Sequence, residues 1–210
     1  MKYYSTQTTF QWPIDDLVCV FWQRYPNPYA KHVLSEDVLS REVVGDTIRT
    51  KRLLVKSSPM PKWGEVITTA RNVAIVEDSV FDRVSRTLTT YTRNVAMAKM
   101  LSVEERCVYG PDGAGSSNNT GNTLLSREAW FDSQVPGFSR AVQRYALTRF
   151  KFNCSNATKG FIHKLTERFG APATPPTSDC QKKSSQGLKS KLDDSIGMLK
   201  HSATLNKQVD

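Results

Sequence analysis

Six extended segments follow one another between residues 32 and 132 without a helical segment between them. Each is rich in residue types that favour strands, and Gly, Asp, Asn or Pro residues separate most of them. The segments cover residues 32–44, 47–56, 72–82, 86–95, 99–109 and 123–132. Parallel neighbours require a crossover connection, usually a helix, so this succession predicts an antiparallel meander.

One strand and a short N-terminal helix precede the meander, and a long helix follows it. Residues 2–10 are rich in Thr and Tyr and predict the first strand. Apolar residues then recur at helical spacing behind Pro13, at Ile14, Leu17, Val18, Phe21 and Trp22. Residues 139–169 lack proline and stop at Gly170, which predicts one long helix with Gly160 as its weakest position. We therefore expect an α+β fold in which a curved seven-stranded antiparallel sheet grips this helix around a hollow for an apolar ligand.

The chain of 210 residues is long enough for one domain and a remainder. We expect a domain over residues 1–170 and a basic tail over residues 171–210 that is rich in Pro, Ser and Lys. Within the tail, apolar residues recur at helical spacing and are compatible with a short amphipathic helix, either free or lying on a membrane. They are Leu188, Leu192, Ile196, Leu199 and Ala203.

The sequence carries 29 Lys and Arg residues against 20 Asp and Glu residues, a formal net charge of +9. Such an excess favours an anionic partner, which is nucleic acid, phospholipid headgroups or an acidic protein. No apolar stretch approaches the roughly 20 residues of a bilayer span. The N-terminal residues match neither a secretion signal nor a transit peptide, so we expect any entry into an organelle to use another route.

The sequence lacks the motifs of the common catalytic centres. It contains no Gly-x-Ser-x-Gly elbow, no His-Glu-x-x-His, no phosphate loop and no Gly-x-Gly-x-x-Gly. Glu104 and Glu105 are neighbours on a predicted strand, so they point to opposite faces and cannot share a substrate. Four cysteines stand far apart without a Cys-x-x-Cys pair, which indicates free thiols rather than a zinc site. We expect neither an enzyme nor a protein that needs a cofactor or metal.

A basic turn follows the predicted short helix. Arg24, Lys31 and His32 surround a segment that Pro26 and Pro28 stiffen, so several donors are held near one another at low entropic cost. This arrangement suits an anion. A solvated basic turn is the alternative interpretation.

Further cations lie on a predicted strand and on the long helix. Alternation in the strand over 47–56 puts Arg52 and Lys56 on one face together with aliphatic residues, which suits a phosphate with acyl chains behind it. Two other cations occupy the opposite face, so parity does not say which face is inside. Arg149 and Asn153 lie four residues apart on one helix stripe, which faces either a ligand or solvent.

The connection between the strands predicted at 47–56 and 72–82 contains Pro61, Lys62 and Trp63. Trp and Lys are favoured at the headgroup level of a bilayer. The segment therefore predicts a membrane contact, with a buried staple at the sheet edge as the alternative.

Several longer motifs stand out along the chain. The first is Arg24-Tyr25-Pro26-Asn27-Pro28-Tyr29 followed by Lys31-His32-Val33-Leu34. The others are Arg52-Leu53-Leu54, Pro61-Lys62-Trp63, Thr89-Thr90-Tyr91-Thr92, Val103-Glu104-Glu105-Arg106-Cys107-Val108-Tyr109, Arg127-Glu128-Ala129-Trp130 and Arg149-Phe150-Lys151. Together these motifs resemble the PRELI-domain family of mitochondrial intermembrane-space lipid carriers, and the resemblance covers about residues 1–170.

The resemblance implies a helix-grip lipid-transfer fold and a carrier that performs no covalent chemistry. It implies transfer of phosphatidic acid from the outer to the inner mitochondrial membrane through the intermembrane space, which supplies cardiolipin synthesis. It also implies transient contact with anionic membranes and a heterodimer with a small helical-hairpin protein that carries twin cysteine motifs. No nucleic acid is expected among the partners.

Carried over to this chain, the resemblance assigns six headgroup-binding positions, which are Arg24, His32, Arg52, Lys56, Arg149 and Asn153. The loop around Pro61, Lys62 and Trp63 becomes a lid. One relative has lysines where this chain has Pro59 and Asn156, which implies a thinner basic ring here.

Other functions stay open at this point. The slowmo-type subgroup of the family handles phosphatidylserine, although the continuation Tyr29-Ala30-Lys31-His32 favours the phosphatidic acid branch. A basic nucleic-acid module is consistent with the net charge and with aromatic residues on strands, but the paired aromatic residues of an RNA-binding signature are missing. A lipid hydrolase requires a nucleophile and a base that the sequence does not reveal.

Overall fold

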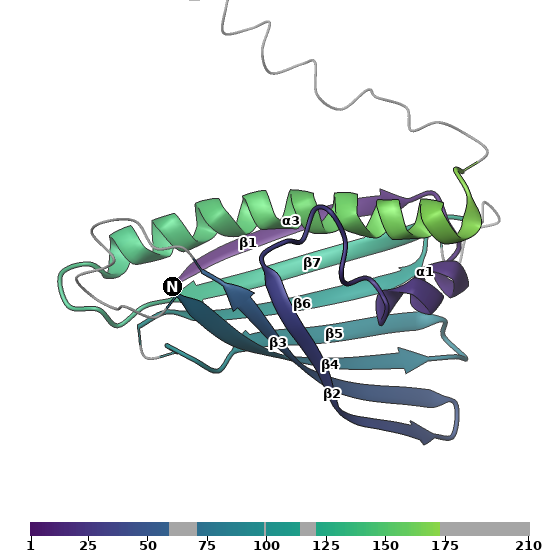
Figure 1. Cartoon of the computed structure of the whole chain (residues 1–210), viewed down its shortest axis with the longest axis horizontal. Coiled ribbons are helices and arrows are strands. Elements are labelled where there is room, and N and C mark those ends of the chain that lie inside the picture. Colours follow the sequence, from purple (N-terminus) through teal and green to yellow (C-terminus); the bar gives the residue numbers. More distant parts are fainter. Residues whose placement is uncertain (59–70, 99, 114–120, 173–210) are drawn as a thin grey trace, which may run out of the picture. The chain divides into compact units, whose positions relative to one another are not determined.

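The computed structural model describes residues 1–58, 71–98, 100–113 and 121–172. Its elements are β1 (Lys2–Phe10), α1 (Ile14–Phe21), β2 (Val33–Val44), β3 (Thr47–Ser57), β4 (Asn72–Asp82), β5 (Thr87–Asn94), β6 (Ser102–Pro111), β7 (Thr123–Asp132) and α3 (Ser139–Phe169). All seven strands join one antiparallel sheet in the order β1-β7-β6-β5-β4-β3-β2 (Figure 1). This confirms the predicted fold class.

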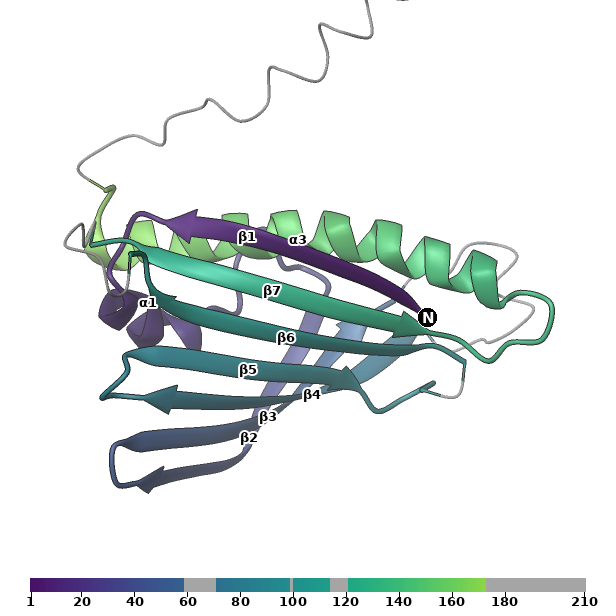
Figure 2. The same ribbon diagram turned by 180° about the vertical axis from the view of Figure 1, so that it is seen from behind.

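The sheet is a meander in which each strand from β2 to β7 pairs with the next, and β1 closes against β7. The long helix α3 runs along the β1 and β7 side of the sheet and contacts both strands (Figure 2). The short helix α1 lies at one end and contacts α3 and β6. Among the described helices, none combines the length and the apolar character that a bilayer span requires.

The domain predicted over residues 1–170 corresponds to a compact unit that spans Met1–Ala173. Most of the predicted tail, including its amphipathic helix, lies outside the described residues, and so does the loop that contains Pro61, Lys62 and Trp63. The division into domain and tail and the predicted lid therefore stay predictions.

Side chains from α1 and from the inner face of the sheet fill one end of the domain. The predicted apolar face of α1 is buried as expected, with Trp22 packed partly buried behind it. It meets Phe10 and Leu125 from the sheet and Phe161 and Leu165 from α3 in one continuous core. Because this end is packed solid, the hollow between sheet and helix lies closer to the N-terminus of α3.

The strand predicted over 99–109 begins late, at Ser102. The delay comes from a tight turn before it, in which the side-chain amide of Asn94 donates to the backbone oxygens of Ala96 and Leu101, each at 2.8 Å. These bonds replace strand pairing with a side-chain-bridged turn. The other predicted strand edges differ from the observed ones by two residues at most.

Gly160, the predicted weak point of α3, is the position where the helix contacts the turn before β2. A Cβ atom at Gly160 would lie 2.5 Å from the Oδ1 atom of Asn27. That side chain donates to the backbone oxygen of Arg24 at 2.8 Å and accepts from the backbone N–H of Tyr29 at 3.0 Å. The absence of a side chain therefore lets the basic turn before β2 pack directly on α3.

Gly160→Ala should lower the free energy of unfolding by about 1–2 kcal/mol, measured by urea denaturation. Alanine favours a helix interior by about 1 kcal/mol over glycine. Displacing Asn27 disrupts two hydrogen bonds worth about 1 kcal/mol each and adds local overpacking. Ser155→Ala, an exposed change on the same helix, is the control and should not destabilise the protein. An alanine at position 160 that stabilises the fold would contradict this contact.

Candidate ligand-binding pocket

A cavity of about 280 Å³ lies between the inner face of the sheet and α3. Apolar side chains form the end that points away from α1. They are Met97, Met100, Leu101, Val103, Phe131, Val142, Ala146 and Phe150. This end belongs to a second apolar cluster around Phe131 that is separate from the core beneath α1.

Polar side chains cross the floor of the cavity between the two apolar clusters. Strand pairing aligns Glu77 with Thr92 and Thr92 with Glu105, and in the next row it aligns Thr90 with Cys107 and Cys107 with Arg127. All six line the cavity, and we call them the polar belt. The period of two in each strand produces it, since these positions share the inward face. The cavity therefore has a polar middle and an apolar end.

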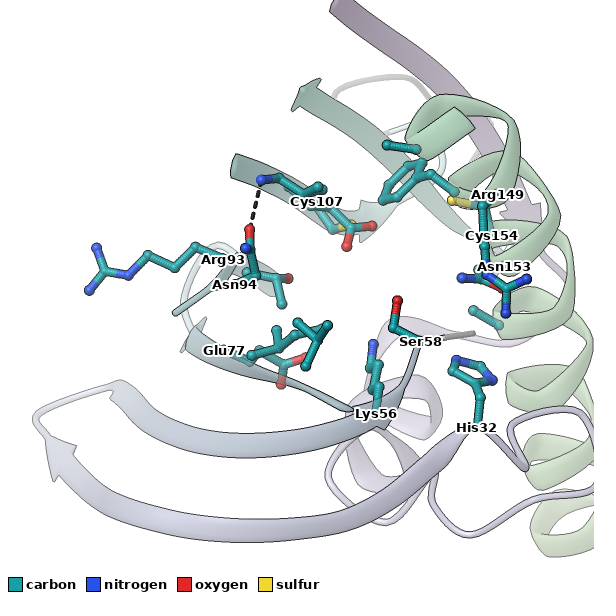
Figure 3. Close-up of a pocket in the computed structure, with 18 of the residues that line it drawn as sticks. His32, Lys56, Ser58, Glu77, Arg93, Asn94, Cys107, Arg149, Asn153 and Cys154 are labelled. Carbon is teal, nitrogen blue, oxygen red and sulfur yellow. Dashed lines mark hydrogen bonds between the residues drawn. The ribbon is translucent and has the colours of Figure 1, made fainter. Parts of the chain in front are cut away.

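Four of the six predicted headgroup residues meet at the side of this cavity. His32 precedes β2, and Lys56 lies near the end of β3. Ser57 donates its backbone N–H to the His32 oxygen at 2.8 Å, which holds the two segments together. Arg149 and Asn153 approach from α3, opposite His32 and Lys56 (Figure 3). We call His32, Lys56, Arg149 and Asn153 the basic cluster, and all four side chains are half-buried.

The basic cluster is electrostatically prepared for an anion. Burial, followed by the charges of Lys56 and Arg149, lowers the pKa of His32 below its ordinary value of 6.5. The imidazole is therefore neutral near pH 7 in the free protein. An anion placed among these groups relieves the repulsion between the two cations and opposes their effect on the pKa of His32.

Arg24 and Arg52 are held in a buried ionic network instead. Arg52 is fully buried; its Nε donates to Glu77 Oε1 at 3.0 Å, its Nη2 also donates to that oxygen, and its Nη1 donates to Glu36 Oε1 at 2.8 Å. Arg24 donates from Nη2 to Glu77 Oε2 at 2.5 Å and from Nη1 to the Phe21 backbone oxygen at 2.7 Å.

The sequence groups Arg24 and Arg52 with the headgroup ligands, but the structure neutralises both with carboxylates. Arg24 lines the cavity floor, whereas Arg52 lies beneath it. Alternation in β3 correctly pairs Arg52 and Lys56 on one face, and burial shows that this face points inward. The two residues nevertheless have different surroundings, because Glu77 and Glu36 come from neighbouring strands.

Glu77 is the carboxylate that both arginines of this network share. Burial alone would raise the pKa of Glu77, but the charges and hydrogen bonds of Arg24 and Arg52 outweigh it and hold the pKa below its ordinary value. A lowered folded-state pKa stabilises the fold above the unfolded value near 4.5. This stabilisation is lost as the pH falls through the folded-state pKa.

Glu77→Gln should reduce the free energy of unfolding by about 3–5 kcal/mol, because it leaves two buried guanidinium groups without their shared carboxylate. It should also flatten the decline of stability in acid. The matched control is Asp78→Asn on the outer face of the same strand, where a half-exposed pair with Lys51 at 3.3 Å should contribute at most about 1 kcal/mol. Equal losses in the two variants, measured by denaturant unfolding at neutral and acidic pH, would contradict the assigned role.

Glu105 and Arg127 are charged residues that line the cavity but are not among the predicted ligands. The Nε atom of Arg127 lies 3.2 Å from Glu105 Oε1, yet its N–H has no acceptor in good hydrogen-bond geometry. Cys107 donates its thiol to the same Glu105 oxygen at 3.4 Å, and burial raises the pKa of that thiol well above its ordinary value. The thiol therefore stays protonated, and Glu105 forms an ion pair with Arg127 while it accepts a hydrogen bond from Cys107.

The prediction that Glu104 and Glu105 face opposite sides is confirmed, since Glu104 is exposed and Glu105 lines the cavity. Alternation in β7 places Arg127 between the inward residues Leu125 and Ala129. This pattern in the sequence could have identified Arg127 as a cavity residue. Asn156 is half-buried on α3, next to the cavity residue Ala157.

A curved antiparallel sheet that holds an amphipathic cavity against one long C-terminal helix defines the helix-grip class of ligand-binding protein. The model of the PRELI-like family matches residues 15–171. The chain belongs to this family.

Curated relatives agree with the assignment. PRELI domain-containing protein 1, mitochondrial, from Gallus gallus is 42% identical over 90% of this chain and 87% of its own length. The protein of the same name from Homo sapiens is 43% identical over 81% of this chain and 78% of its own length. Protein UPS1, mitochondrial, from Saccharomyces cerevisiae is 36% identical over 70% of this chain and 85% of its own length.

Solved structures share the fold at low sequence identity. TTHA0849 from Thermus thermophilus has a TM-score of 0.54 at 15% identity and covers 79% of this chain and 98% of its own. Zhui aromatase/cyclase from a Streptomyces species has a TM-score of 0.52 at 10% identity and covers 83% of this chain and 99% of its own. At these identities the likeness shows the fold alone.

Proposed function

We propose that this protein extracts one anionic phospholipid from a membrane, encloses it and delivers it to another membrane, and that phosphatidic acid is its main cargo. The observation that carries the proposal is the basic cluster beside a cavity with an apolar end. The basic cluster suits the phosphate of a two-tailed phosphate ester, and the apolar end suits its acyl chains. Membership of the PRELI-like family supports the same role.

The headgroup binds at the basic cluster. Lys56 supplies a compact charge, Arg149 supplies a planar fork of donors for phosphate oxygens, and the Asn153 amide adds a neutral donor. A phosphate that leaves water loses its hydration, and that loss is prohibitive unless cations and hydrogen bonds replace it. Charge-assisted hydrogen bonds are worth about 1.5–3 kcal/mol each, which is enough to compete with the membrane surface.

The acyl chains extend toward the apolar end of the cavity. The core beneath α1 closes the other direction, since that end is packed solid. Burial of apolar surface contributes about 25 cal/mol for each Å² removed from water, so chains held against Leu101, Val103 and Phe150 stay out of solvent in transit.

The pocket fits a phosphate monoester better than a headgroup with an ammonium group. Among the described lining residues the carboxylates are Glu77 and Glu105, and each is already paired with arginine. An ammonium group, as in phosphatidylserine, finds no free carboxylate there. Phosphatidylserine transfer is the second candidate and requires one of these ion pairs to open.

We place this activity between the outer and inner mitochondrial membranes, in the intermembrane space, where it supplies cardiolipin synthesis. Relatives from chicken, human and yeast that are named mitochondrial proteins support this location. The carrier works without covalent chemistry and forms a heterodimer with a small helical-hairpin protein that has twin cysteine motifs. The headgroup positions His32, Lys56, Arg149 and Asn153 and the lid at Pro61, Lys62 and Trp63 belong to this proposal. Arg24 and Arg52, the other two predicted positions, support the cavity floor in it.

Lys56→Gln and Arg149→Gln should each reduce transfer of fluorescent phosphatidic acid between vesicles by roughly tenfold to a hundredfold, because each removes a charge-assisted hydrogen bond. Lys51→Gln is the matched control, since Lys51 lies on the outer face of the same strand as Lys56. Undiminished transfer in both cluster variants would refute the assigned headgroup site. Phosphatidylserine vesicles run in parallel decide between the two cargoes.

The affinity for phosphatidic acid should rise as the pH falls toward and below 6.5. An anionic headgroup raises the pKa of His32, which burial, Lys56 and Arg149 lower in the free protein. Binding therefore takes up a proton in the window between the two pKa values, and the gain levels off below the lower one.

His32→Gln keeps a hydrogen-bond donor and removes this titration. The difference between the pH profiles of the wild type and the variant isolates His32 from the second ionisation of the phosphate itself, near pH ~6. Parallel binding profiles of the two proteins would contradict the contact between His32 and the headgroup.

A further inference from the structure

A row of aromatic residues follows one edge of α3. Phe138, Tyr145 and Phe152 are spaced seven residues apart, so they lie on one edge of the helix nearly two turns apart. Phe138 caps the helix and its backbone oxygen accepts the first helical hydrogen bond, from Val142 at 3.0 Å. We call these three residues the aromatic row.

The aromatic row borders the cavity and also faces outward. Tyr145 lines the cavity, as does Arg149 one turn farther along. Phe138 and Phe152 are 54% and 64% exposed, respectively. The core contribution of α3 comes from other positions, among them Ala146 and Leu165. Two large apolar side chains thus expose more than half of their surface, Phe152 next to Asn153 of the basic cluster and Phe138 at the N-terminal end of the helix.

The surroundings of the row are basic. Within α3 the cations are Arg140, Arg144, Arg149, Lys151, Lys159, Lys164 and Arg168. The helix contains a single carboxylate, Glu167, which pairs with Lys164 at 2.9 Å. Exposed aromatic residues set among cations, with almost no negative charge, are characteristic of helices that lie in the interface of an anionic bilayer.

We propose that this edge of α3 is a membrane-docking surface for anionic bilayers, with Phe138 and Phe152 inserted at headgroup level and the exposed Arg144 held near lipid phosphates. The proposal rests on the proposed lipid transfer. It adds a second membrane contact to the one proposed for the lid. Docking here turns the side of the cavity that holds Arg149 toward the bilayer. A lipid then reaches the basic cluster along the aromatic edge without crossing bulk water.

The test is vesicle flotation of the full-length protein with Phe138→Ser and Phe152→Ser combined. Recovery with phosphatidylcholine vesicles that contain phosphatidylglycerol should fall at least about tenfold relative to the wild type. Phe169→Ser is the control, because Phe169 is an exposed phenylalanine of the same helix on a different edge. The control should float like the wild type, and vesicles of phosphatidylcholine alone should recover little of any protein.

A second readout separates docking from cargo binding. Binding of short-chain, water-soluble phosphatidic acid should be unchanged in the double variant, since it requires no bilayer. Unaltered flotation of the double variant, an equal loss in the Phe169 variant, or equal recovery on neutral and anionic vesicles would each overturn the docking surface. So would loss of both readouts in a variant with unchanged circular dichroism. Absence of soluble-lipid binding in the wild type, with the flotation pattern intact, would instead remove the proposed cargo and leave the docking surface standing.

Discussion

Glu77 joins four parts of the chain through two arginines. It accepts from Arg24, which follows α1, and from Arg52 on β3, and Arg52 also binds Glu36 on β2. Burial of any one of these charges alone would be prohibitive, so the group is stable only when all members are present. The position of the α1 end against the curved sheet, and with it the floor of the cavity, therefore depends on one carboxylate.

The cations around the cavity fall into two groups, according to whether the protein supplies a counterion. Arg24, Arg52 and Arg127 have their charge balanced by protein carboxylates, whereas Lys56 and Arg149 have no ion pair among the described residues. A ligand phosphate is the missing counterion for the second group. The cavity can thus keep an apolar end and still bind an anion, because Lys56 and Arg149 put positive charge without a protein counterion at one side.

Local pattern was sufficient to predict the strands and the long helix, because alternation, helical spacing and turn residues act over a few positions. The strands at 2–10, 72–82 and 123–132 and the helix at 139–169 have the predicted bounds. The ion pair of Arg52 was not predictable in this way. Its partner Glu77 is 25 residues away in the sequence and becomes a neighbour only through strand register. The charged floor formed by Glu105 and Arg127 depends on the same long-range alignment.

The two ends of the cavity are unequal, and this gives the cargo a direction. Side chains from α1 and α3 fill one end around Phe161, while the basic cluster lies at the middle and the apolar wall extends beyond it toward Phe150. A lipid bound with its phosphate at Arg149 must therefore point its acyl chains away from α1. The polar belt opposes the reverse orientation, because acyl chains laid over Glu105 and Arg127 would bury those charges without any polar contact from the ligand.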